Sequence, residues 1–500
     1  MTAPPSESRP SEELPSGAIE DSEVSAQNPS GTLAAAAAFV REPFRTASRP
    51  GVVELLRLSW PVMLSQFLVT TVALADIAMV GRLGPHALAA VGYATQFFFM
   101  TQSALFAVGF ACVALMARAI GAEDPARARA ALGGSLWVSV VTAALVCGAA
   151  LIMPRTILGW LNAEPVVIEH TVPYMRLVLG STLILAVSLV LENGLRADKD
   201  TFTPMLVAWI VAAVKITLSA VLIFGLFGFP RLELVGAGVA TVISQAIGLT
   251  AFATVVLSRP KSSPVAVRAR DVIAGLGLFR TIVRVAAPGV AERMVLNLAL
   301  LSYFAVLGGY GTVVVAAYTL GVRAISFSWI PGTAFAAAAA TLVGQALGRG
   351  DEGEAKAVGR RAVSVALVTA IVLGLLTVPM VDLVAAALTT DDATAVVLAP
   401  LLLSIAVAQP MLQTHFTLAG VFRGAGDNWT PLVSAAIGNW GVRVPLALLC
   451  AYVLKTGVNW VWAVLVLDHV ARVTWLLISF RSGRWLRKLP TSRRGARVPV

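Results

Sequence analysis

The first long apolar run of the sequence, residues 58–80, is 23 residues long and contains one charged side chain, Asp76. As a helix it would be roughly 34 Å long, which is enough to cross the hydrocarbon core of a bilayer. A carboxylate inside such a segment is costly unless it is paired, protonated or hydrated. Because Ser65 lies within about 20° of Asp76 around the helix, this polar face is predicted to point toward protein or a water-filled cavity.

The composition indicates that the whole chain, and not only residues 58–80, is built from membrane-crossing segments. Of the 500 residues, 57% are hydrophobic and 13% are charged, whereas a soluble chain of this length needs a more polar surface. Twelve apolar stretches predict an all-α polytopic membrane protein with 12 transmembrane helices. The net charge of +11 does not indicate a nucleic-acid partner, because the basic residues lie in short connections between these stretches.

The pattern of reactive residues argues against an enzyme. Cys112, Cys147 and Cys450 lie inside apolar stretches and have no metal-ligand spacing. No nucleophile–base or metal constellation is present in the sequence. We therefore predict no metal, no cofactor and no enzyme activity.

Lysine and arginine are distributed unequally between the two sides of the predicted helices. The even-numbered connections hold sixteen of them, and the odd-numbered connections hold four. Positive residues accumulate on the cytoplasmic side of membrane proteins. We therefore predict a multi-pass protein of the cell membrane with both termini and all even-numbered connections in the cytoplasm.

The sequence repeats itself after 227 residues without a gap. The identical pairs are Arg57 with Arg284, Pro61 with Pro288, Gly84 with Gly311, Gly121 with Gly348, Asp124 with Asp351, Pro173 with Pro400, Arg196 with Arg423, Asp200 with Asp427, Thr203 with Thr430, and Pro204 with Pro431. Ten identities under one offset predict two copies of six helices. The copies have the same orientation because six is even.

The repeat divides the chain into five parts. They are a disordered cytoplasmic tail at residues 1–50, an N-terminal six-helix lobe at 51–257, a cytoplasmic linker at 258–280, a C-terminal six-helix lobe at 281–480, and a basic cytoplasmic tail at 481–500. The eighth helix is predicted as one span, residues 312–342. Two repeated loops are predicted to be capped hairpins and turns, in which an Asp or Asn precedes a new helix. Asp468 and Arg472 are predicted to pair, because they are four residues apart on the twelfth helix.

Polar and aromatic side chains form a stripe on the second predicted helix. Its members lie within about 120° of arc at 100° per residue, and they are Gln96, Phe99, Met100, Ser103, Phe106 and Phe110. Stripes of this kind usually face lipid or core, but two polar members favour a cavity. The repeat matches Gln96 with Arg323. We therefore predict a central substrate cavity between helices one, two, seven and eight, lined by Ser65, Gln96, Phe99, Ser103, Glu292 and Arg323.

These motifs resemble the multidrug and toxic compound extrusion (MATE) family over residues 52–480. The resemblance rests on the pattern P-x14-D-x4-G-x2-G from Pro61 to Gly84 followed by LAAVG, on ARAIGAEDPARA, on the paired R-x3-D-x2-TP loops, and on NWGVRVPLA. It implies a V-shaped pair of lobes that exports organic cations or amphipathic drugs and metabolites. Inward flow of protons or sodium would drive the export.

The resemblance also implies an ion-coupling site. In proton-coupled members an Asp on the first helix acts with an Asn and an Asp on the fifth helix and a Thr on the sixth. Asp76 and Thr241 match this pattern, whereas Lys215 stands at the Asn position and Ser219 at the Asp position. The acids of sodium-coupled members are absent from residues 295–301 and 409–413. We therefore predict coupling to protons rather than sodium, with Asp76 carrying the proton.

Two other transporter classes fit parts of the pattern. A lipid-linked precursor flippase of the same superfamily would use cavity cations for a pyrophosphate head group, and the candidates here are Arg176, Lys215, Arg323 and Arg443. A major-facilitator metabolite transporter also has six plus six helices, but its G-x3-D-R-x-G-R signature is missing. The predicted partners are the lipid bilayer and small organic substrates, and we expect a monomer.

The predicted topology can be tested with reporter fusions. Alkaline phosphatase fused after Arg268 or after Phe480 should be inactive, and a fluorescent protein at the same positions should fluoresce, because both segments are basic. Active phosphatase at either position would contradict the number of spans.

Overall fold

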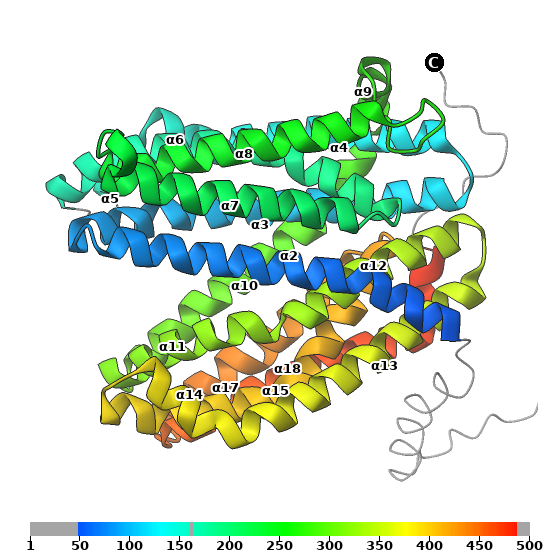
Figure 1. Cartoon of the computed structure of the whole chain (residues 1–500). Coiled ribbons are helices and arrows are strands. Elements are labelled where there is room, and N and C mark those ends of the chain that lie inside the picture. The colour runs from blue at the N-terminus through cyan, green and yellow to red at the C-terminus, as the bar shows by residue number, and fades with distance from the viewer. Residues whose placement is uncertain (1–48, 161–163, 488–500) are drawn as a thin grey trace, which may run out of the picture.

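Residues 49–160 and 164–487 are described by the computed structural model, and over these residues the chain is helical with no β-strand (Figure 1). Within these residues, twelve segments are long and apolar enough to cross a membrane, which confirms the predicted all-α polytopic fold. The predicted disordered tail lies outside the described residues except for its last two. The same is true of residues 488–500 of the predicted basic tail.

Before the linker, the described part of the N-terminal lobe contains seven α-helices. They are α2 (Arg49–Gly81), α3 (Pro85–Gly121), α4 (Pro125–Ile152), α5 (Pro154–Trp160), α6 (Pro165–Ala197), α7 (Phe202–Phe224) and α8 (Glu233–Ser258). The C-terminal lobe repeats this order. Its helices are α10 (Phe279–Gly308), α11 (Thr312–Ser328), α12 (Ile330–Gly348), α13 (Glu352–Thr377), α14 (Val381–Leu388), α15 (Asp392–Gly424), α16 (Trp429–Ala436), α17 (Val444–Leu448) and α18 (Val458–Ser482). The pair α11–α12 begins and ends 227 residues after α3, and α15 does so after α6.

The repeated loops have the predicted capping geometry. Asp351 accepts a hydrogen bond from the backbone N–H of Glu354 at 2.8 Å, and Asp124 accepts the equivalent bond from Arg127 at 2.9 Å. In the second pair of loops, Asp200 and Asp427 each accept bonds from the backbone N–H and the hydroxyl of a Thr three residues later. At each of these helix starts, a backbone N–H group that has no partner within the helix therefore finds an acceptor in the preceding loop.

The eighth span differs from its prediction as one helix. It is broken at Trp329 into α11 and α12. Pro331, in the first turn of α12, has no N–H to donate and its ring clashes with the carbonyl four residues earlier. The equivalent residue in the unbroken α3 is Ala104. A π-helix, Ile437–Arg443, likewise interrupts the eleventh span between α16 and α17.

The predicted linker is packed rather than extended. It contains α9 (Ala269–Gly275), which lies against α4. A Cβ on Gly275 would lie 2.2 Å from the backbone nitrogen of Gly134, and Arg129 Nε lies 3.4 Å from Asp271 Oδ1. The linker therefore forms part of the N-terminal lobe.

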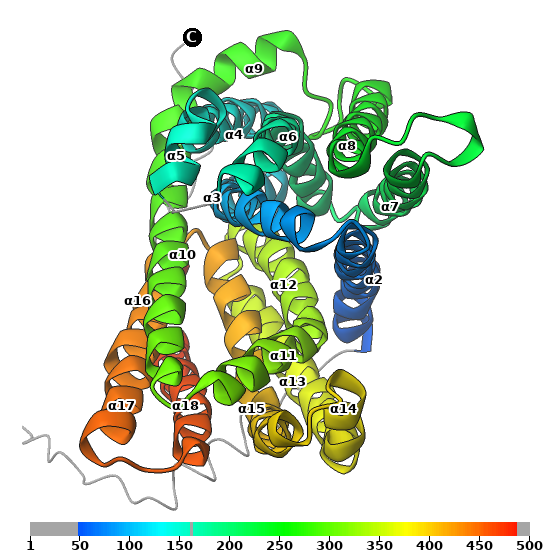
Figure 2. The ribbon, with the colours of Figure 1, turned by 90° about the vertical axis from the view of Figure 1, so that its left-hand side faces the viewer.

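The two lobes meet at one end, which we call the apex, and diverge toward the other (Figures 1 and 2). At the apex the ends of α3 and α12 touch backbone to backbone. A Cβ on Gly121 would lie 2.1 Å from the carbonyl oxygen of Gln345, and one on Gly348 would lie 2.2 Å from that of Arg118. These two glycines are repeat counterparts, so the same contact is made twice about a pseudo-two-fold axis.

Hydrogen bonds between the lobes add to this contact. Gln345 Nε2 donates to the carbonyl oxygen of Ala197 at 2.8 Å, and Thr341 Oγ1 donates to that of Arg196 at 3.1 Å. Both acceptors belong to the last turn of α6, where helix carbonyls lack partners within the helix. The apex is thus closed by packing and by satisfied polar groups.

The first helix of each lobe crosses from one lobe to the other (Figure 2). In α2, Leu55 and Leu58 are buried in the core of the C-terminal lobe, whereas Val80 is buried in that of the N-terminal lobe. In α10, Ile282 packs against the N-terminal lobe, whereas Tyr303 belongs to the core of the C-terminal lobe. Any change in the angle between the lobes must therefore move or bend α2 and α10.

The apex contact predicts that two glycine substitutions differ in their effect on the stability of the protein. Gly121→Ala should destabilise the protein by about 1–3 kcal/mol, because its methyl group meets backbone that cannot move alone. Gly180→Ala is the matched control, since no atom lies within 4 Å of its Cβ position. Thermal unfolding in lipid nanodiscs should show a lower Tm for the first variant only. An unchanged Tm for Gly121→Ala would show that the apex is loosely packed.

Candidate functional site

The four residues of the predicted ion-coupling site lie together in the N-terminal lobe, between α2, α7 and α8. Lys215 Nζ lies 3.1 Å from Asp76 Oδ2 and donates a 2.6 Å hydrogen bond to Thr241 Oγ1. Ser219 Oγ donates to Asp76 Oδ1 at 3.3 Å. The sequence placed these residues at one site only through the family resemblance, and the geometry brings all four into contact.

Helix geometry explains how the site is assembled. Lys215 and Ser219 are one turn apart on α7 and so share a face. Lys215 Nζ also donates to the carbonyl oxygen of Ala237 on α8, at 3.2 Å. Its ammonium therefore has three acceptors, one charged and two neutral, which offset the cost of its burial. Asp76 is more accessible, because its side chain is 29% exposed.

The residues predicted for a substrate cavity differ in exposure. Gln96, Phe99 and Arg323 are exposed and Ser103 is half-buried. Ser65 is buried, and its hydroxyl donates to the carbonyl oxygen of Pro61 at 2.8 Å. Glu292 is also buried. It lines a pocket between the lobes, and none of the other five predicted residues is among the residues that line this pocket.

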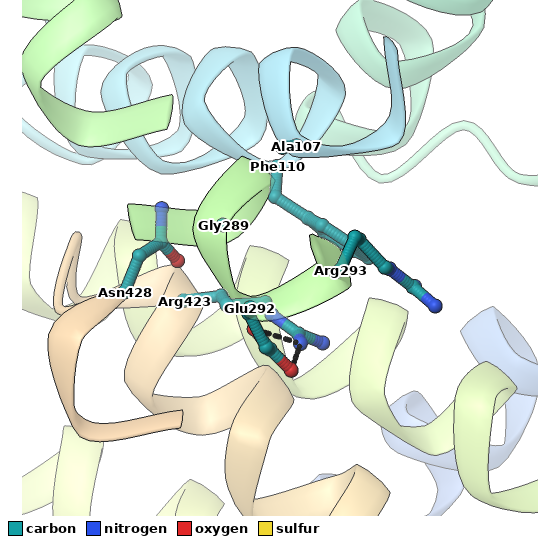
Figure 3. Close-up of a pocket in the computed structure, with 7 residues that line it drawn as sticks. All are labelled: Ala107, Phe110, Gly289, Glu292, Arg293, Arg423 and Asn428. Carbon is teal, nitrogen blue, oxygen red and sulfur yellow. Dashed lines mark hydrogen bonds and ion pairs between the residues drawn. The ribbon is translucent and has the colours of Figure 1, made fainter. Parts of the chain in front are cut away.

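This interlobe pocket is lined by residues of both lobes (Figure 3). They are Ala107, Phe110, Gly289, Glu292, Arg293, Arg423 and Asn428. Arg423 Nη2 donates to both carboxylate oxygens of Glu292, at 2.8 and 2.9 Å. The Arg423 guanidinium also lies over the Phe110 ring, 4.6 Å from its centroid. Arg423 therefore connects α15 to α10 in its own lobe and to α3 in the other.

A second charged cluster lies in the C-terminal lobe. Asp468 is fully buried and forms ion pairs with Arg443 and with Arg472, whose Nε lies 2.5 Å from Asp468 Oδ1. The pairing with Arg472 confirms the prediction. The Arg443 guanidinium lies 5.6 Å from the centroid of the Tyr303 ring.

This cluster is the repeat counterpart of the Asp76 site. The sequence analysis missed this correspondence between the two sites. The 227-residue offset matches Asp76 with Tyr303 and Thr241 with Asp468. Arg443 is one residue beyond the counterpart of Lys215, at the end of the π-helix. Applying the offset to every charged position would have revealed a cation on the fifth helix of each lobe. It would also have shown that the acid lies on the first helix of the N-terminal lobe and on the sixth helix of the C-terminal lobe.

Two repeated lobes of membrane-crossing helices, with charged groups buried within and between them, define a membrane transporter. The sequence model described as MatE matches residues 61–221 and 288–449, one match in each lobe. The chain therefore belongs to the multidrug and toxic compound extrusion (MATE) family.

Relatives and solved structures cover nearly the whole chain. The probable multidrug resistance protein NorM of Thermotoga maritima is 26% identical over 440 residues, which are 88% of this chain and 94% of the relative. A protein of the same name from Bradyrhizobium diazoefficiens is 29% identical, covering 82% of this chain and 89% of the relative. An outward-facing MATE transporter structure has a TM-score of 0.81 at 22% identity, covering 88% of this chain and 97% of that one. A MOP superfamily transporter from Pyrococcus furiosus has a TM-score of 0.80 at 22% identity, with the same coverage.

The contact between Asp76 and Lys215 predicts energetic coupling. A double-mutant cycle with Asp76→Asn and Lys215→Gln should give an interaction energy of about 0.5–3 kcal/mol in the free energy of unfolding. The control is the exposed pair of Lys199 and Glu54, 2.6 Å apart, for which we expect about 0–1 kcal/mol. Equal coupling in the two pairs would show that Asp76 and Lys215 are screened from each other.

Proposed function

We propose that this protein is a proton-driven antiporter of the cytoplasmic membrane, with both termini inside the cell. Its substrates are organic cations or amphipathic drugs and metabolites, which it exports. The names of its relatives, multidrug resistance proteins, support the direction and the substrate class. The observation that carries the proposal is the Asp76–Lys215 ion pair, because it places a partly accessible carboxylate on a helix that touches both lobes.

Protonation of Asp76 would change how α2 is held. With Asp76 ionised, its carboxylate accepts from Lys215 on α7 and from Ser219 on the same helix. With Asp76 neutral, the Lys215 ammonium keeps two neutral acceptors on α8 and loses its counter-charge. The attraction between α2 and α7 then weakens. Because the beginning of α2 is packed in the other lobe, this loosening favours a different angle between the lobes.

The position of Lys215 supports protons over sodium as the coupling ion. Its ammonium is surrounded by a carboxylate, a hydroxyl and a backbone carbonyl, which are the oxygen ligands that a hard metal cation would use. A sodium ion would have to displace a covalently attached cation from these ligands. A proton needs only one oxygen of Asp76.

The two alternative functions are less well supported. Membership of the MATE family overturns the major-facilitator alternative. A flippase would need free cavity cations, but Lys215 is paired with Asp76 and Arg443 with Asp468. Two of the four candidate cations are therefore neutralised by carboxylates of the chain.

The proposal predicts different effects of two substitutions at the site. In everted vesicles, Asp76→Asn should abolish export driven by a proton gradient while leaving substrate binding intact, because the variant cannot exchange a proton. Lys215→Asn should retain transport with a shifted pH dependence, because it restores the residue that the family resemblance implies. Asp382→Asn, at an exposed acid of α14, is the control. Wild-type export by Asp76→Asn down the same gradient would move the coupling residue elsewhere.

A further inference from the structure

Four exposed arginines surround the junction between the linker helix α9 and the crossing helix α10. They are Arg268, just before α9, Arg270 in its first turn, and Arg280 and Arg284 in the first two turns of α10. None of the four forms an ion pair with a carboxylate of residues 49–160 and 164–487. The one acid between residues 259 and 291 is Asp271, which is buried and already paired with Arg129 on α4. The junction therefore carries positive charge that this part of the chain does not compensate.

Apolar side chains lie between these arginines on the same face. Ile273 is 67% exposed and Leu276 is 49% exposed. The backbone is right-handed helical on both sides of the short 3₁₀ turn that joins α9 to α10. Spacings of three or four residues therefore follow one face of the helix, and its members are Arg270, Ile273, Leu276, Arg280 and Arg284. Basic and apolar groups share this outward face, as they do in helices that lie in the membrane interface.

The length of this helical stretch places the junction at the edge of the membrane. Ala269–Gly308 is 40 residues long, whereas about 20 residues cross the hydrocarbon core. Its first residues thus extend beyond the core into the region of the lipid head groups. Figure 2 shows α9 at the outer edge of the N-terminal lobe, on the side away from the C-terminal lobe. An apolar side chain there can contact acyl chains, while a long arginine side chain reaches the level of the phosphates.

The backbone beneath this face is fixed by α4. A Cβ on Gly133 would lie 2.5 Å from the carbonyl oxygen of Asp271, so α9 packs on α4 without intervening side chains. Asp271 Oδ2 accepts a 3.0 Å hydrogen bond from the backbone N–H of Arg268 and so caps α9. Arg129 Nη1 donates to the carbonyl oxygen of Ser263 at 3.2 Å, which ties the preceding part of the linker to the same helix. A site on a fixed backbone needs little ordering when a ligand binds.

We propose that the α9–α10 junction binds an anionic phospholipid, with its phosphate held by the arginines and an acyl chain along Ile273 and Leu276. Arginine binds phosphate through charge-assisted and often bidentate hydrogen bonds. A lipid of the phosphatidylglycerol class is favoured because its net negative charge complements the junction, whereas phosphatidylcholine brings its own cation. The lipid is a bound partner and not the exported cargo, so this inference is independent of the export function.

A lipid at this position would join two parts of the structure. Arg268 and Arg270 extend from the segment that is fixed on α4, whereas Arg280 and Arg284 belong to the helix that crosses to the C-terminal lobe. One head group that contacts both sets holds the beginning of α10 against the N-terminal lobe, where Ile282 is already packed.

The test titrates the full chain in detergent micelles with dioleoyl phosphatidylglycerol or dioleoyl phosphatidylcholine, and native mass spectrometry measures the binding of the first lipid. We expect phosphatidylglycerol to bind at least about tenfold more tightly, since each arginine near a lipid phosphate contributes about fivefold. Combining Arg268→Gln, Arg270→Gln, Arg280→Gln and Arg284→Gln should remove this preference. Lysine at the same four positions should retain most of it, because the charge is kept.

Two further variants separate the parts of the site. Ile273→Ser with Leu276→Ser should weaken the binding of both lipids by a similar factor and leave the preference for phosphatidylglycerol unchanged, because only the acyl-chain contact is lost. Arg57→Gln with Arg349→Gln is the matched control and should change neither. Both of these arginines are exposed, and Arg57 is the repeat counterpart of Arg284.

The inference is overturned if the wild type binds the two lipids equally or if the fourfold glutamine variant keeps the preference. Unchanged lipid binding in the serine variant would likewise exclude the acyl-chain contact. An equal loss in the control variant would show a general attraction to basic residues and no defined site. Competition by glycerol 3-phosphate as effective as that by phosphatidylglycerol would assign the arginines to a soluble phosphate compound.

Discussion

The backbone contact between the ends of α3 and α12 determines how the two lobes meet. It requires Gly121 and Gly348 at counterpart positions, because any side chain there would collide with a carbonyl group of the other helix. The contact is made once by each lobe, so it has pseudo-two-fold symmetry. The lobes diverge from this point, and the interlobe pocket lies about three helical turns before it on α3, where α10 passes that helix.

Symmetry of the backbone does not extend to the charges. The crossing helix α2 carries Asp76, whereas α10 has Tyr303 at the equivalent position and places Glu292 where α2 has Ser65. Each crossing helix thus holds one buried or half-buried acid, at a different depth and with a different partner. In the N-terminal lobe the acid binds Lys215 within the lobe, and in the C-terminal lobe it binds an arginine that also touches the other lobe.

Much of the fold could be predicted because its signals are local. The caps at Asp124 and Asp351 and the repeat itself depend only on nearby residues or on a fixed offset. The break at Pro331 was missed, since proline kinks some membrane helices without ending them. The Glu292–Arg423 pair was also missed, because these residues are 131 positions apart and meet only through packing of the folded helices. The Asp76 site was predicted from the family resemblance and not from spacing.

The hydrogen bonds across the apex link the transport cycle to water. Gln345 supplies a donor to the Ala197 carbonyl at the end of α6, and Thr341 adds a second donor to the Arg196 carbonyl, which also accepts from the backbone N–H of Lys199. If α12 separates from α6, the Ala197 carbonyl loses its donor, and water replaces it at a polar helix end. Separation of the lobes at this point therefore requires water to enter a contact lined by Gly121 and Gly348.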